Sequence, residues 1–123
     1  MSDLISPELI RREGDPALLL LCDHASNHIP SGYGFLGLSE GDLSRHIAFD
    51  IGARGLTLAL SDLFEAPAVL SAVSRLVIDP NRGEDDPTLV MKLYDGAIIP
   101  GNRGADAAEM ATRLRTIYRP YHE

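Results

Sequence analysis

Histidine and carboxylate side chains gather in two segments of the sequence. The segment CDHASNHIP contains Asp23 and His24, and the segment HIAFD contains His46 and Asp50. Imidazole is the commonest protein ligand for zinc, and a catalytic zinc needs about three protein ligands and an open position for water. Neither segment supplies that set alone. The same side chains are also typical of turns and helix starts, where they bond backbone amides, so both interpretations stay open.

A third polar segment, SRLVIDPNR, carries Arg75, Asp79, Asn81 and Arg82. A guanidinium group grips a carboxylate through two parallel hydrogen bonds, so this segment favours an acidic ligand or a developing oxyanion. The alternative is a structural ion pair on the surface, which contributes little to stability. Its partners would be the acids of the loop that follows, Glu84, Asp85 and Asp86.

The elements that must position these residues are predicted from the apolar pattern. The continuous apolar run Ala17–Cys22 predicts a buried strand that ends directly before the first histidine segment. Open α/β sheets bind ligands beyond the carboxyl ends of their strands, so this position favours function. Ser39 followed by Asp42 predicts a helix start, and Asp50 is a candidate cap for a helix that runs to Leu63.

The second half of the chain alternates between apolar and turn-forming segments. Ala66–Ala72 and Leu76–Ile78 are rich in branched apolar residues and predict two short internal strands. Gly83–Gly104 is dominated by Gly, Pro, Asp and Asn and predicts an irregular loop. From Ala105 to Tyr121 apolar residues recur at helical spacing. This order of elements predicts one layered α/β domain over residues 1–123.

Charge and apolar content narrow the classes of partner. The net charge of −7 repels phosphate backbones and the basic residues are scattered, so we expect no nucleic-acid partner. The longest apolar run, Ala17–Cys22, is far shorter than the ~20 residues that cross a bilayer, so we expect no membrane span. The amino terminus lacks the basic-then-apolar order of a signal peptide, and the single cysteine fits a reducing compartment. These features predict a cytoplasmic protein.

Four segments together, CDHASNHIP, RHIAFDIGA, SRLVIDPNR and IIPGNRG, resemble the N-formylglutamate amidohydrolase family in this order, from about Leu20 to Gly104. That family is similar in fold to zinc carboxypeptidases and aspartoacylases, which implies a three-layer α/β/α arrangement with a mixed central sheet. The resemblance also implies hydrolysis of N-formyl-L-glutamate to glutamate and formate during histidine degradation. The expected partner is therefore a small, carboxylate-bearing N-acyl amino acid.

The resemblance also implies a role for single residues. It makes His24 the first ligand of a divalent metal, most simply zinc. Carboxypeptidases have a glutamate three residues after that histidine, but this sequence has Asn27 there. Asp50 is then the candidate for the second ligand, as a carboxylate within the second motif. Arg75 stands where an arginine that polarises the substrate carbonyl is expected.

The pair Asn81 and Arg82 resembles the Asn-Arg pair that holds the substrate carboxylate in these hydrolases. Family members continue past the helix near Tyr121 into a region that supplies a further histidine ligand and the general base. We therefore expect an incomplete domain with little or no hydrolase activity on its own and only marginal stability. We also expect it to be prone to self-association, because one sheet edge is left uncovered. The alternative function is a carboxylate-binding module that lacks a complete metal site.

Overall fold

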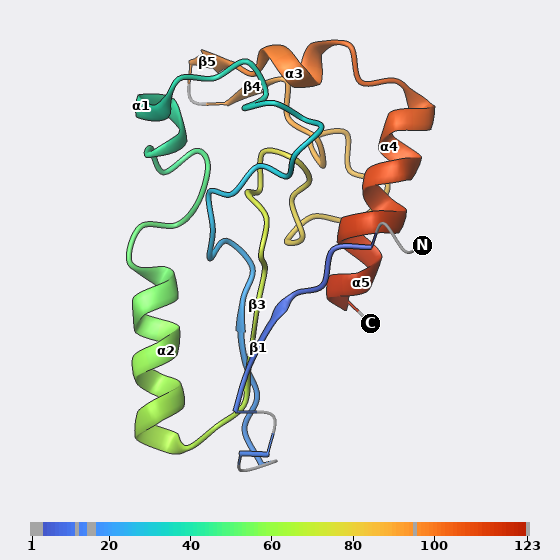
Figure 1. Cartoon of the computed structure of the whole chain (residues 1–123). Coiled ribbons are helices and arrows are strands. Elements are labelled where there is room, and N and C mark those ends of the chain that lie inside the picture. The colour runs from blue at the N-terminus through green and yellow to red at the C-terminus, as the bar shows by residue number, and fades with distance from the viewer. Residues whose placement is uncertain (1–3, 12, 15–16, 95, 123) are drawn as a thin grey trace.

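The computed structural model describes residues 4–11, 13–14, 17–94 and 96–122. A mixed sheet of three short strands forms its centre, in the order β1-β3-β2 (Figure 1). β3 pairs antiparallel with β1 and parallel with β2. The bounds of these strands are β1 (Glu8–Ile10), β2 (Leu20–Cys22) and β3 (Ala68–Leu70). The predicted α/β class with a mixed sheet is therefore confirmed.

Helix α2 (Ala53–Phe64) joins β2 to β3 and covers one face of the sheet. Cys22, Ala68 and Leu70 are buried beneath it, with Ala53 packed against them. The helix was expected to begin at an Asp50 cap, and that expectation is wrong. The cap position is Gly52, at φ 82°, and the Asp50 carboxylate instead contacts His24 and Arg75. The earlier helix α1 (Glu40–Leu43) does begin as predicted, with Ser39 Oγ accepting from the Asp42 amide at 3.2 Å.

Two predictions for the strands need correction. The first predicted strand is shorter than expected and is buried on one face only, since Leu21 is 62% exposed. Leu76–Ile78 is fully buried but forms a turn instead of a strand, in which the Val77 amide donates to Ser74 O at 3.1 Å. Its apolar side chains pack into the larger core, which also contains Leu36, Ile47, Leu89 and Ile99. A buried turn is as apolar as a buried strand, so the sequence pattern did not distinguish the two.

The predicted loop Gly83–Gly104 contains regular structure. A hairpin of β4 (Leu93–Tyr94) and β5 (Ala97–Ile98) leads into α3 (Pro100–Arg103). The predicted carboxyl-terminal helix is confirmed as a run of helical elements that Asp106 caps. These elements are α4 (Ala107–Arg113), a π-helical turn η1 (Leu114–Tyr118) and α5 (Arg119–His122).

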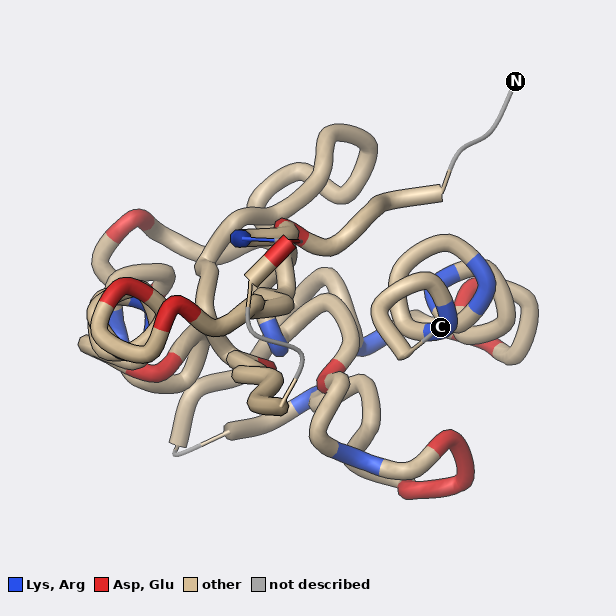
Figure 2. Tube along the Cα trace, turned by 90° about the horizontal axis from the view of Figure 1, so that it is seen from below, with Lys and Arg blue, Asp and Glu red and all other residues tan. Residues whose placement is uncertain are grey.

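Charge is distributed over several elements. Figure 2 shows basic residues interspersed with acidic ones instead of gathered along one stripe. Within the described ranges, no helix combines the length and the apolar character that a membrane span requires.

A buried amide ties the last helices to the turn that precedes the polar site. Asn102 is fully buried, and its Nδ2 donates to Leu76 O at 2.7 Å and to Met91 O at 2.8 Å. Its Oδ1 accepts from the buried Arg113 at 2.7 Å, and Arg113 also donates to Val77 O at 2.9 Å. Every polar atom of the Asn102 side chain is thus satisfied without water.

We predict that Asn102→Ala lowers the free energy of unfolding by about 2 to 4 kcal/mol, because it leaves buried carbonyls and the Arg113 guanidinium without their partner. Denaturant unfolding followed by circular dichroism measures this loss. Asn27→Ala is the matched control, since Asn27 is exposed and donates one bond, to Leu43 O. Equal losses in the two variants would show that the Asn102 contacts do not stabilise this part of the fold.

Candidate functional site

The polar segments meet where the two parallel strands end. β2 ends at Cys22 and is followed directly by Asp23 and His24. β3 ends at Leu70, and the chain then turns through buried residues to Arg75 and Asp79. Since parallel strands point their carboxyl ends to the same edge of a sheet, their following loops lie together. The predicted position of His24 at such a strand end is confirmed.

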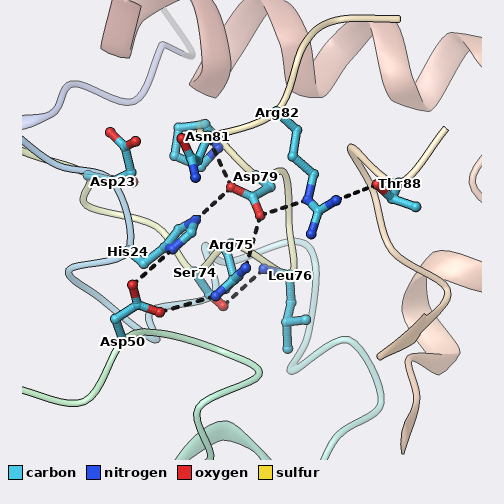
Figure 3. A network of polar contacts seen from close by, with 12 residues as sticks. Asp23, His24, Asp50, Ser74, Arg75, Leu76, Asp79, Asn81, Arg82 and Thr88 are labelled. Carbon is cyan, nitrogen blue, oxygen red and sulfur yellow. Dashed lines mark hydrogen bonds and ion pairs between the residues drawn. The ribbon is translucent and has the colours of Figure 1, made fainter. Parts of the chain in front are cut away.

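Asp79 lies at the centre of the site, and we call it and its side-chain partners His24, Arg75 and Arg82 the Asp79 cluster (Figure 3). Its carboxylate is fully buried. Oδ1 is 2.7 Å from His24 Nε2, and Oδ2 is 3.2 Å from Arg82 Nε and 3.4 Å from Arg75 Nη2. The backbone amide of Asn81 also donates to Oδ1, at 2.9 Å. One carboxylate therefore contacts an imidazole, two guanidinium groups and the backbone at the start of the Asn-Arg pair.

Asp50 closes the cluster from the other side. Its Oδ2 lies 3.2 Å from His24 Nδ1, and its Oδ1 accepts from Arg75 Nη1 at 3.1 Å. Unlike Asp79, it is half exposed. Arg75 is buried, and its guanidinium also lies over the Tyr94 ring at 5.2 Å. Its Nε is buried without a hydrogen-bond partner among the described residues.

The charges of the cluster shift its titrating groups in opposite directions. Burial alone would lower the pKa of His24, but the hydrogen bond and charge of Asp79, with a further bond to Asp50, leave that pKa raised. Burial alone would raise the pKa of Asp79, but the bonds from His24 and the Asn81 amide and the nearby Arg75 charge leave it lowered. Each partner thus favours the ionised form of the other.

The Asn-Arg pair forms part of the wall of a cavity of about 810 Å³. Asn81 is exposed, whereas Arg82 is partly buried, with Nη1 donating to Thr88 Oγ1 at 2.6 Å. Asp23 lines the same cavity, and its Oδ1 accepts from Tyr121 Oη at 2.6 Å. Burial and this bond raise the pKa of Tyr121, so the phenol stays protonated.

The residues predicted to hold a metal are brought together only in part. His24 and Asp50 meet, and Asp79 takes the other ring nitrogen of His24. A metal-binding histidine ordinarily donates its second nitrogen to a carboxylate in this way, so this part of the donor set fits a metal. His46 lies apart and stacks edge-on with Tyr94, at 6.3 Å between centroids. Within the described ranges, no three His, Cys, Asp or Glu side chains form a group able to hold a metal ion.

Two contributors were not recognised from the sequence. Asp79 was noticed within its motif but received no role, because a buried position cannot be inferred from the letters alone. Tyr121 lies 98 residues from its partner Asp23, and only the fold brings them together. The one available signal for Asp79 was the apolar segment Leu76–Ile78 directly before DPNR.

Comparison with known proteins places the chain among a group of hydrolases. A family model described as N-formylglutamate amidohydrolase matches residues 16–123. The structure is similar to the crystal structure of gene product Atu2144 from Agrobacterium tumefaciens, with 38% sequence identity and a TM-score of 0.92. That match covers 98% of this chain and 48% of the other, so the chain spans about half the length of that solved structure. No curated protein matched the sequence.

We predict that Asp79→Asn lowers the free energy of unfolding by about 3 to 5 kcal/mol, because it leaves the buried Arg75 and His24 without their main counter-charge. Chemical denaturation at neutral pH measures the loss. Asp62→Asn is the control, since Asp62 pairs with Arg11 on the surface, where such a pair is worth about 0 to 1 kcal/mol. A loss no greater than that of the control would contradict the central role of Asp79.

We also predict a pH dependence of the stability of the metal-free chain. The raised pKa of His24 means that its contribution is fully present below its ordinary value of 6.5 and is lost as the pH rises through the folded-state value. The lowered pKa of Asp79 means that its contribution is present above 3.8 and is lost as the pH falls. Unfolding free energies of the wild type and His24→Gln, measured across this range, should converge at alkaline pH. A constant difference would rule out this linkage.

Proposed function

Because the chain belongs to the N-formylglutamate amidohydrolase family, we propose that it forms part of the active site of a metal-dependent hydrolase that cleaves the formyl amide of N-formyl-L-glutamate. The products would be glutamate and formate, as expected for histidine degradation. The observation that supports the proposal most is the Asp79 cluster, which gathers four of the five predicted site residues by direct contact or through the Asn81 amide. Asp50, the fifth, joins through His24 and Arg75.

The substrate carboxylate would bind to Arg82 and Asn81. Arg82 uses Nε and Nη1 for Asp79 and Thr88, and its side chain is 31% exposed at the cavity wall. The guanidinium is therefore held in place before a ligand arrives, with N–H groups left to donate. Asn81 is exposed beside it and lines the same cavity, so its amide can add a second contact.

His24 and Asp50 would be the two metal ligands from this chain. Asp79 engages Nε2 of His24, which leaves Nδ1 as the nitrogen that faces Asp50. When bound, a divalent metal, which we take to be zinc, supplies a Lewis acid that polarises the formyl carbonyl. Arg75 would stabilise the negative charge that develops on the carbonyl oxygen. Its guanidinium is held beside the proposed metal ligand Asp50, whose Oδ1 accepts from Nη1 at 3.1 Å.

The proposal extends to the complete fold. We infer a three-layer α/β/α arrangement similar to zinc carboxypeptidases, with the third metal ligand and the general base outside this chain, which spans about half of its solved relative. We also propose a cytoplasmic location, which the free, buried thiol of Cys22 supports.

A second function is a carboxylate-binding module without metal. One observation favours it: the part of the chain that the structure describes contains no complete group of metal-binding side chains. In that case Asn81 and Arg82 would still bind a carboxylic acid, and a metal chelator would not change the affinity. Metal content separates the two functions.

We predict that Arg82→Ala weakens the binding of N-formyl-L-glutamate about ten- to a hundredfold, because a hydrogen bond to a charged group is worth about 1.5 to 3 kcal/mol. Calorimetric titration of the chain measures this. The matched control is Arg103→Ala, which removes the exposed arginine of the other Asn-Arg pair, in α3. Unchanged affinity in Arg82→Ala, or an equal loss in the control, would exclude the assigned role.

We predict that the native parent protein, which has the complete active site inferred above, retains zinc and releases formate from N-formyl-L-glutamate, and that His24→Gln in it loses both properties. Mass spectrometry gives the metal content, and the formate assay gives the activity. His28→Gln is the control, because His28 is an exposed histidine of the same segment. Metal-free native protein that still binds the substrate would favour the binding module instead.

A further inference from the structure

We propose that Tyr118 and His122, at the end of the carboxyl-terminal helical run, are positioning residues that fix the backbone on both sides of Asn81. Their effect is to aim the Asn81 amide at the substrate carboxylate. This role rests on the proposed function, in which Asn81 and Arg82 hold that carboxylate. We call Tyr118 and His122 the aromatic pair.

The aromatic pair binds the two carbonyls that flank Asn81. Tyr118 Oη donates to Arg82 O at 2.7 Å. His122 Nε2 lies 2.9 Å from Pro80 O. Because a carbonyl oxygen can only accept a hydrogen bond, Nε2 of His122 is the donor in this contact. One contact therefore precedes Asn81 in the chain, and the other follows it.

Asp79 binds the backbone amides of the same segment. Its Oδ1 accepts from the Asn81 amide at 2.9 Å, and its backbone oxygen accepts from the Arg82 amide at 3.2 Å. Figure 3 shows Asn81 and Asp79 side by side. The Pro80–Asn81 peptide is thus held at its carbonyl by His122 and at its amide by Asp79. Since peptide groups are planar, holding the groups on both sides of the Asn81 Cα restricts its φ and ψ.

The two residues of the Asn-Arg pair are oriented in different ways. The Arg82 side chain has its own contacts with Asp79 and Thr88, which hold the guanidinium without the aromatic pair. The Asn81 side chain is exposed at the cavity wall, so its direction depends on the backbone from which it projects. The aromatic pair therefore acts mainly on Asn81.

Ring packing holds the two donors in place. The ring centroids of Tyr118 and His122 are 4.6 Å apart, and those of Tyr121 and His122 are 5.2 Å apart. Tyr118 is the last residue of the π-helical turn η1. Such turns are rare and are frequent at functional sites. The three rings limit one another's rotation, so both donors face the backbone of the Asn81 segment.

The same helix end also binds the other loop of the site. Tyr121 Oη donates to Asp23 Oδ1 at 2.6 Å, and Asp23 directly precedes His24. Tyr118, Tyr121 and His122 all line the cavity that Asn81 and Arg82 line. The end of the helical run thus contacts both loops that carry the proposed site residues.

The test separates positioning from simple attachment of the helix end to the fold. Calorimetric titration of the full chain with N-formyl-L-glutamate compares Tyr118→Phe in the wild type and in Asn81→Ala. This change keeps the ring and removes one donor, so we expect binding about three- to tenfold weaker in the wild type. In Asn81→Ala the same change should cost less than about twofold, because contributions that act through one residue are not additive. Simple attachment gives equal losses in the two backgrounds.

A conservative variant and a matched control complete the comparison. His122→Gln keeps an N–H donor and should bind within about twofold of the wild type, whereas His122→Leu should lose about as much affinity as Tyr118→Phe. Tyr33→Phe removes a tyrosine hydroxyl elsewhere, where the ring lies against Arg113, and should bind as the wild type does.

Nuclear magnetic resonance relaxation tests the positioning without a ligand. We expect order parameters near about 0.85 for the Asn81 and Arg82 amides in the wild type, and below about 0.6 for Asn81 in Tyr118→Phe/His122→Leu. Unchanged order parameters in that double variant would overturn the inference. So would equal losses of affinity in the two backgrounds, or a His122→Gln variant as impaired as His122→Leu. A wild type that does not bind N-formyl-L-glutamate, with Asn81 mobile only in the double variant, would support the positioning role and count against the proposed function.

Discussion

The site depends on one buried carboxylate that must stay ionised. Asp79 has no exposed surface, and burying a single charge is costly unless charged and hydrogen-bonding partners surround it. Two guanidinium groups, the His24 imidazole and one backbone amide do so. Because His24, Arg75 and the Asn81 amide together lower the pKa of Asp79, the loss of any one of them weakens the stabilisation of its charge. The positions of His24, Arg75 and Arg82 thus follow from one electrostatic requirement.

That requirement can be met because the scaffold brings distant segments to one place. Parallel pairing of β2 and β3 sets His24 beside the turn that carries Arg75 and Asp79. Two buried side chains hold the turn itself: Asn102 donates to the Leu76 carbonyl and Arg113 donates to the Val77 carbonyl. In the second Asn-Arg motif, Asn102 therefore has a structural role. The first motif, Asn81 and Arg82, lines the cavity instead.

How much could be predicted depended on how local each signal was. Two predictions depended only on residues close together in the sequence: the start of a helix at Ser39 and the amphipathic carboxyl-terminal helical run. Both are confirmed. The motifs also identified His24 and Asp50, which the structure brings into contact. Their roles as ligands stay predictions. Leu76–Ile78 was misassigned because a buried turn and a buried strand are equally apolar.

The exact partners within the site depended on contacts that sequence spacing does not reveal. Asp50 contacts His24, 26 residues away in the sequence, instead of capping α2, and this contact exists only in the folded chain. The order of the cluster comes from the buried Asp79 carboxylate and its contacts with His24, Arg75 and Arg82. Covering the cavity would exclude water and strengthen the field of Arg82 at the bound carboxylate.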